Sequence, residues 1–352
     1  TMDLTDVVFD SIYHADTGGG LFNFAGESFT ANRVQISNML PNTAQVSMYP
    51  AFTINSKTSE LDNFTIMNTG VFSLFALPGS QSTLTNWNVS NIGSVFISTQ
   101  TTTNSLTIQN LQITDSDLAT NFAIFITTAQ LFLNNIQFNN VTSPQYFSTS
   151  GATSGILQNS SFKNGHCSNP CITAQYPTFT LNVTTFENMT SNGGMFQIPF
   201  AASQMTMDQV TFVFHVQNGA LAIQLVGLSN YFNVSSTHFE NSSAYLGAAL
   251  YINATETTTA PNIAPIRVIT DNTFVGNYGT LGCGMALSSI GYTAVTNNIF
   301  DSSENCSVDI LLTSSPIGFL GNTIRAPTAA NTLTGAYIQY IIDRSVLSSG
   351  VA

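Results

Sequence analysis

The chain has 352 residues, of which only 7% are charged, with six Lys and Arg against 18 Asp and Glu. A typical soluble domain carries roughly 25% charged residues, so amides and hydroxyls must supply most of the polar surface. The net charge of −12 forms no dense run and argues against nucleic acid as a partner, because phosphates require clustered Lys and Arg.

The abundant Asn, Ser and Thr favour strands and turns, because Asn and Thr are poor helix formers. No long apolar run occurs, so we expect no membrane span. The opening segment, TMDLTDVVFD, lacks the charged and apolar regions of a signal peptide. We therefore expect a mature product or a fragment of a longer chain.

One pattern recurs from the first residues onward: a large apolar residue, called the anchor here, stands two positions before an Asn. Another Asn or Asp usually precedes the anchor by three or four positions, and the clearest copies read NNIQFNN, NSSFKN, NVTTFEN and SSTHFEN. The anchors are 23 to 35 residues apart, a period typical of solenoids. They are Phe9, Ile36, Ile66, Val89, Ile113, Phe138, Phe162, Phe186, Phe212, Phe239, Phe274, Phe300 and Ile324.

The Asn that follows the anchor predicts a ladder along one edge of a parallel β-helix. Coils stack about 4.8 Å apart, an Asn at a tight corner tolerates a left-handed backbone, and its amide can bond to the Asn one coil on. The sequence therefore predicts an all-β fold, a parallel β-helix of about thirteen coils over residues 1–326. The ladder comprises Asn38, Asn68, Asn91, Asn140, Asn164, Asn188 and Asn241, with Asp115 as a substitute.

Departures from the period predict loops. The interval from Ile36 to Ile66 contains LPNTAQVSMYP and indicates a short loop. The longest interval, from Phe239 to Phe274, carries Pro261 and Pro265, which cannot donate to a strand ladder, so we predict an extruded loop over about 253–266. After Ile324 the pattern fades, and 327–352 is expected to form a distorted coil, a cap or a contact segment.

Four cysteines, Cys167, Cys171, Cys283 and Cys306, allow three pairings. Cys283 and Cys306 are one coil apart and would stack, and Cys167 and Cys171 flank a corner. This spacing favours disulfides between Cys167 and Cys171 and between Cys283 and Cys306, with unpaired buried thiols as the alternative. Disulfides would place the chain in an oxidising compartment.

Several coils carry a second motif. FVGNYGTLGCGMAL, which contains Phe274 and Asn277, FENSSAYLGAALYI and FENMTSNGGMFQI combine F-x-x-N or F-x-N with a Gly-containing apolar segment. The chain thus resembles the right-handed parallel β-helix proteins of the pectin-lyase-like superfamily, and these coils resemble polymorphic-membrane-protein repeats. The resemblance covers most of the chain as architecture but only about four coils as motif. It implies a secreted or surface-displayed solenoid used for adhesion or scaffolding.

Catalytic and metal candidates are scattered. Polysaccharide hydrolases hold two or three carboxylates across a scissile bond, and metal sites need several converging ligands. We therefore predict no catalytic site, no metal site and no cofactor. The groups considered are Asp115 with Asp117; Asp3, Asp6 and Asp10; Asp301, Glu304 and Asp309 with Arg325; and the separate histidines His14, His166, His215 and His238.

N-x-[ST] sequons predict N-glycosylation on exposed corners, although their number is close to what the composition gives by chance. Asn253 falls in the predicted loop, and Asn140, Asn188 and Asn241 coincide with the predicted ladder. The sequons are Asn63, Asn88, Asn140, Asn159, Asn182, Asn188, Asn233, Asn241, Asn253 and Asn305.

These features together predict a non-catalytic, extracellular structural or adhesive solenoid, secreted or on a cell surface and eukaryotic in origin. Its partners would be N-glycans and further copies or segments stacked end to end, because nothing resembling a cap precedes the first coil. Two alternatives remain: a carbohydrate-active enzyme, and a carbohydrate-binding module that uses Tyr231, Tyr245 and Tyr251.

Overall fold

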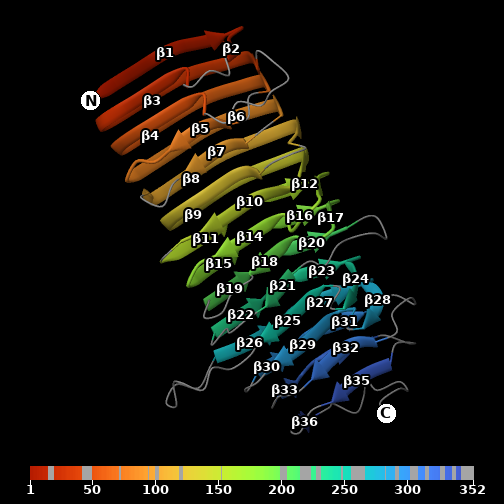
Figure 1. Ribbon diagram of the computed structural model, residues 1–352. Helices are drawn as coiled ribbons and strands as arrows, with labels where there is room; N and C mark the ends of the chain where they lie inside the picture. Colours follow the sequence, from red (N-terminus) through yellow and green to blue (C-terminus); the bar gives the residue numbers. More distant parts are fainter. Residues whose placement is uncertain are drawn as a thin grey trace. The chain divides into compact units, whose positions relative to one another are not determined.

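The computed structural model divides the chain into two compact units, Thr1–Tyr176 and Pro177–Ala352, and each is described by itself. All regular elements in the described part are β-strands (Figure 1). That part contains no helix whose length and hydropathy would allow it to cross a membrane. The described residues are 1–14, 20–41, 50–70, 73–93, 95–99, 103–118, 122–151, 153–198, 204–214, 223–226, 231–246, 249–254, 266–281, 283–289, 293–301, 308–313, 317–325, 330–334 and 338–341.

The N-terminal unit is built from long strands that bend around corners and from shorter strands that close each turn. The long strands are β1 (Met2–Asp10), β3 (Phe22–Pro41), β4 (Phe52–Thr69), β6 (Gln81–Ile92), β8 (Thr103–Asp117) and β9 (Phe122–Ser143). The shorter strands are β2 (Tyr13–His14), β5 (Ser73–Leu77), β7 (Val95–Thr99), β10 (Gln145–Ser150), β11 (Ser154–Gln158), β12 (Ser161–Lys163), β13 (His166–Cys167) and β14 (Ile172–Gln175).

The C-terminal unit repeats the same turn with shorter strands. These are β15 (Thr178–Asn182), β16 (Thr185–Glu187), β17 (Thr190–Ser191), β18 (Phe196–Ile198), β19 (Gln204–Asp208), β20 (Thr211–Val213), β21 (Ile223–Val226), β22 (Tyr231–Ser235), β23 (His238–Glu240), β24 (Ser243–Leu246), β25 (Leu250–Ala254), β26 (Ile266–Thr270), β27 (Thr273–Val275), β28 (Tyr278–Leu281), β29 (Met285–Ser289), β30 (Thr293–Thr296), β31 (Ile299–Asp301), β32 (Val308–Thr313), β33 (Ile317–Leu320), β34 (Thr323–Ile324), β35 (Ala330–Thr334) and β36 (Ile338–Ile341).

Every strand pairing in these units is parallel and joins one coil to the next. In the N-terminal unit Phe9 is in register with Ile36, Ile36 with Ile66, and the anchors continue in this way to Phe162. In the C-terminal unit the register runs from Phe186 through Phe212 to Ile324. The predicted all-β, parallel β-solenoid fold is therefore confirmed.

The number of turns is smaller than predicted. An anchor marks one strand, whereas a turn also needs the strands and corners that close the circuit. About nine turns are supported in place of about thirteen coils.

The anchors fill the interior. In the N-terminal unit those from Ile36 to Phe162 are at most 1% exposed. The one tryptophan, Trp87, is buried beside Phe64 with ring centroids 4.4 Å apart, and its indole N–H donates to the Leu61 carbonyl at 3.0 Å. In the C-terminal unit consecutive anchor rings from Phe186 to Phe300 stack nearly parallel, with centroids 4.7–5.3 Å apart.

The predicted loop begins later than expected. Asn253 lies inside β25, in register with Val226 and Ser288, because the strand continues through Ala254. Ile266 already belongs to β26, and residues 255–265 lie outside the described ranges. Within the predicted terminal segment 327–352, β35 and β36 pair in parallel with β32 and β33.

Candidate functional site

The most regular polar feature of the solenoid is a corner two positions after the anchor, called the first corner. Its residues take φ values between 48° and 57°. This left-handed conformation costs most L residues about 1–2 kcal/mol, and short polar side chains tolerate it best. The first corner includes Asn38, Asn68, Asn91, Asp115, Asn140, Asn164, Asn188 and Asn241.

Side-chain amides at the first corner join successive coils of the N-terminal unit. Asn68 Nδ2 donates to Asn38 Oδ1 at 3.2 Å, and Asn91 Nδ2 donates to Asn68 Oδ1 at 2.8 Å. Asp115 has no N–H to donate, so the series restarts there, with Asn140 donating to Asp115 at 2.7 Å. One coil further, Asn164 donates to Asn139 rather than to Asn140.

A second corner, three positions before the anchor, was not predicted as a ladder. It also takes positive φ values, including those of Asp6, Arg33, Asn63, Asn86, Asn110, Asn135, Asn159, Val183, Gln209, Ser236, Asp271 and Asn297. Asn135 donates to Asn110 at 2.8 Å and Asn110 to Asn86 at 2.9 Å. The Asn or Asp that precedes most anchors was the available signal, and its variable spacing of three or four positions obscured it.

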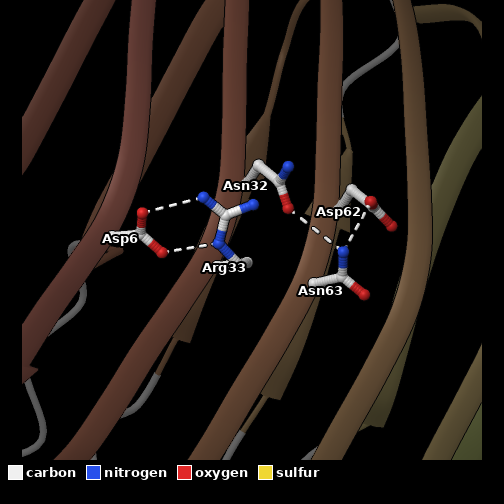
Figure 2. Close-up of polar contacts among 5 residues, drawn as sticks. All are labelled: Asp6, Asn32, Arg33, Asp62 and Asn63. Atoms are coloured by element: carbon white, nitrogen blue, oxygen red, sulfur yellow. Dashed lines mark hydrogen bonds and ion pairs between the residues drawn. The ribbon is translucent and has the colours of Figure 1, made fainter.

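Figure 2 shows how the second corner begins. The Arg33 guanidinium donates to both carboxylate oxygens of Asp6, at 2.5 and 2.7 Å. On the neighbouring coils, Asn63 Nδ2 donates to Asn32 Oδ1 at 3.1 Å and to Asp62 Oδ2 at 2.8 Å. The hydrogen bond from Arg33 lowers the pKa of the exposed Asp6 carboxyl, and the Arg33 charge adds to this effect.

The corner hydrogen bonds have a direction. In each of these side-chain hydrogen bonds between coils, the donor belongs to the later coil and the acceptor to the earlier one. A carboxylate can therefore begin a ladder, because the first member needs only to accept. Asp10 does so immediately before the first corner, accepting from Asn38 at 2.9 Å and from Ser37. Asp62 plays the same part immediately before the second corner and accepts from Asn86 at 2.8 Å.

The C-terminal unit contains buried amides that the sequence interpretation missed. Asn272 Nδ2 donates to Asn298 Oδ1 at 2.9 Å, and Asn298 Nδ2 donates to Asn322 Oδ1 at 2.9 Å. These residues lie two positions before their anchors; Asn272 and Asn298 are buried, and Asn322 is half-buried. Asn277, from the F-x-x-N motif, is also buried and accepts from the Ser242 backbone N–H at 2.8 Å. The two motifs thus differ: F-x-N places Asn at a corner, where it is exposed or half-buried, and F-x-x-N turns it inward.

One predicted disulfide is present. Cys167 and Cys171 are bonded, with Cα atoms 5.4 Å apart, and both are fully buried. The Cys171 carbonyl accepts from the Tyr146 and Phe147 backbone N–H groups, which ties this small loop to the neighbouring coil. Cys283 is buried and no described cysteine is free; its predicted partner Cys306 lies outside the described residues.

The acidic candidates are spread over the surface. Asp3 is exposed on β1, while Asp6 and Asp10 are engaged at the corners. Asp117 is exposed at the end of β8, in register with Thr142. Asp301 ends β31 and Arg325 is exposed, Glu304 lies outside the described residues, and of Asp309 only its place in β32 is described.

The described histidines lie in different coils. His238 Nε2 is 3.1 Å from Glu240 Oε2 on β23, and His166 is exposed on β13. His14 is placed on β2 without a described side chain, and His215 lies outside the described residues. Within the described ranges no group of three His, Cys, Asp or Glu side chains could hold a metal ion.

A polar depression lies beside the first corner in the N-terminal unit. It is lined by Asn68, Asn91, Asp117 and the glycines Gly70 and Gly93. Asp117 is the single carboxylate in this lining, whereas glycoside hydrolysis uses a pair. Amide and carboxylate groups of this kind can hydrogen-bond to hydroxyls or water, and they give the depression no acid and base pair.

The sequons fall into two structural groups. Asn63, Asn140 and Asn159 are exposed at corners, and Asn188 and Asn241 are half-buried at the first corner. Asn88, Asn182 and Asn233 lie on strands, with Asn88 exposed and the other two half-buried. Asn253 lies on β25, and Asn305 lies outside the described residues. Of the predicted binding tyrosines, Tyr231 and Tyr251 are half-buried, and Tyr245 is placed on β24 without a described side chain.

Comparison with known proteins finds no similar protein. No protein-family model, no curated protein and no solved structure matches the chain. The pectin-lyase-like and polymorphic-membrane-protein resemblances therefore stay predictions, and the fold that stands is a parallel β-solenoid.

Proposed function

We propose that this chain is a non-catalytic structural solenoid of an extracellular surface protein or filament, and that its coils stack end to end on further copies or segments. The observation that carries the proposal is the exposure of β1. Met2, Leu4, Val7 and Phe9 are half-exposed, although they occupy the inward positions of the coil. Their partners in β3, which are Phe29, Ala31, Val34 and Ile36, are at most 3% exposed.

Figure 1 shows β1 as the outermost strand of the N-terminal unit. One edge of β1 pairs with β3, and the opposite edge offers backbone donors and acceptors to another strand. Leu4 and Phe9 also line an apolar cavity of about 20 Å³ at this end, together with Phe22, Phe29 and Phe52. A strand with the same alternation of inward apolar residues would complete both the sheet and the cavity wall.

Two further features support an extracellular location. The Cys167–Cys171 disulfide is typical of oxidising compartments. With 7% charged residues, the surface depends on amides and hydroxyls for hydration, and N-linked sugars would add to this hydration. A solenoid is suited to scaffolding or adhesion, because successive coils repeat the same polar corners.

The test is assembly of the full chain, followed by sedimentation and electron microscopy. We expect filaments or head-to-tail oligomers, with a spacing of about 4.8 Å between coils. Leu4→Asp should dissociate them, because it places a charge on the apolar end, whereas Val8→Asp should not, because Val8 points outward and is 62% exposed. A wild-type chain that stays monomeric at high concentration, or that releases reducing ends from a polysaccharide, would overturn the proposal.

A further inference from the structure

We propose that Asn88 carries an N-linked oligosaccharide and that it suits this modification better than the sequons Asn63, Asn140 and Asn159 at the described corners. The inference rests on the proposed extracellular function, because the sugar is added in the secretory pathway. In the reaction the Asn88 Nδ2 forms a bond to the anomeric carbon of a lipid-diphosphate-linked oligosaccharide. The bond from that carbon to the diphosphate oxygen breaks, the lipid diphosphate leaves, and the amide loses one proton.

Asn88 lies on a flat strand rather than at a corner. It is exposed in the middle of β6, immediately before the buried anchor Val89, so its side chain points away from the interior. Its φ is not among the positive values that mark the corners. The required hydroxyl two positions on belongs to Ser90.

The Asn88 amide is not engaged by the fold. Within the described part of the chain its side chain makes no hydrogen bond or ion pair. Replacing one of its N–H hydrogens with a sugar therefore breaks no contact described in the structure. Because the amide is exposed, the sugar also requires no buried side chain to move.

The neighbouring coils provide a compatible surface. Asn88 is in register with Thr65 on one side and Gln112 on the other, and the same column continues to Gln35 and Gln137. These side chains are uncharged, and all except the half-buried Thr65 are exposed. Their amides and hydroxyls can hydrogen-bond to the hydroxyls of a sugar that lies along the column.

The corner sequons differ from Asn88, because their side-chain amides already donate hydrogen bonds to other side chains. Asn63 Nδ2 donates to two acceptors, Asn32 and Asp62, so both of its N–H hydrogens are in use. Asn140 Nδ2 donates to Asp115 at 2.7 Å, and Asn159 Nδ2 donates to Asn134 at 2.8 Å. A sugar at Asn63 would remove one of these hydrogen bonds. A sugar at Asn140 or Asn159 would leave a single amide N–H, which would then have to keep the existing hydrogen bond to the neighbouring coil.

The experiment expresses the full chain with a secretion signal in a eukaryotic cell and maps its peptides after enzymatic deglycosylation in ¹⁸O water. We expect Asn88 to be converted largely to ¹⁸O-labelled Asp and Asn63 to remain Asn. Asn88→Gln and Ser90→Ala should each remove the mass of one oligosaccharide. Ser90→Ala is the matched control, because it removes the sequon and keeps the asparagine. Asn63→Gln should leave the glycan mass unchanged.

An unmodified Asn88 in secreted, folded protein would overturn the inference, as would occupancy of Asn63 equal to that of Asn88. Folding is checked independently by circular dichroism and by the intact Cys167–Cys171 disulfide. The glycosylation result and the assembly result can fail independently of each other. Glycosylated Asn88 in a chain that never assembles would contradict end-to-end stacking and leave this assignment standing.

Discussion

At the scale of single residues, the solenoid depends on repeated left-handed corners. Asn fills most of them because its short amide stabilises the strained backbone and also bonds to the next coil. Exceptions occur: Val183 has a φ of 44° and is 44% exposed, although a β-branched residue is a poor choice there. The described residues give no physical reason for valine at this corner.

A substitution of Asn110 measures how much one corner asparagine contributes to the free energy of unfolding, because Asn110 donates to Asn86 and accepts from Asn135. Asn110→Ala should lower the free energy of unfolding by about 2–3 kcal/mol, through the left-handed strain and the lost hydrogen bonds. Asn110→Gly should recover the strain component only, because glycine tolerates this φ. Denaturant unfolding measures both, with the outward-facing Gln112→Ala as the control. Equal stability of the alanine and glycine variants would contradict a backbone requirement at this corner.

We expect the stability of the fold to depend on pH through Asp10. Hydrogen bonds from Ser37 and then Asn38 lower the pKa of its exposed carboxyl in the folded chain. The carboxylate therefore stabilises the fold above the unfolded pKa of about 3.9, and this contribution is lost as the pH falls through the folded pKa. Asp10→Asn keeps an acceptor and does not titrate. The stability difference between wild type and variant should change below about pH 4 and stay flat above pH 5, as measured by unfolding at each pH.

At the scale of elements, the C-terminal unit is held by a stack of anchor rings. Phe239 is fully buried, with ring centroids 5.3 Å from Phe212 and 4.9 Å from Phe274. Phe239→Ala should destabilise the unit by about 3–5 kcal/mol, since it leaves a cavity between two rings. Phe239→Leu should cost clearly less, because it fills part of that space. Chemical unfolding compares the two variants, and equal losses would argue against ring packing as the cause.

A second prediction at this scale concerns the contribution of the buried amides to the free energy of unfolding. Asn298 Nδ2 donates to Asn322 and to the Ile269 carbonyl, and its oxygen accepts from Asn272. Asn298→Leu keeps the branched shape and the number of side-chain heavy atoms but leaves these groups without their partner, at about 1–3 kcal/mol for each buried one. We expect a loss of about 2–4 kcal/mol in the free energy of unfolding. A neutral or stabilising effect would show that the interior ladder contributes specificity rather than stability.

At the scale of the whole molecule, each coil contacts mainly its neighbours, as in other solenoids. Destabilisation should therefore remain local. In hydrogen exchange, Asn110→Ala should reduce amide protection in β6, β8 and β9 and leave β23 and β27 unchanged, and Phe239→Ala should do the reverse. Uniform loss of protection along the chain in either variant would instead show that the whole chain unfolds as one cooperative unit.

The sequence by itself determined the fold class, the register of the anchors and the Cys167–Cys171 pairing. These follow from local and periodic constraints: one buried apolar residue per coil, a corner that favours Asn, and two cysteines four residues apart. Only the tertiary structure decided which amides are engaged. Asn88 and Asn63 both begin an N-x-[ST] sequon, yet one points outward from a strand and the other donates twice at a corner. That difference depends on what the coils above and below present, and a linear pattern does not contain this information.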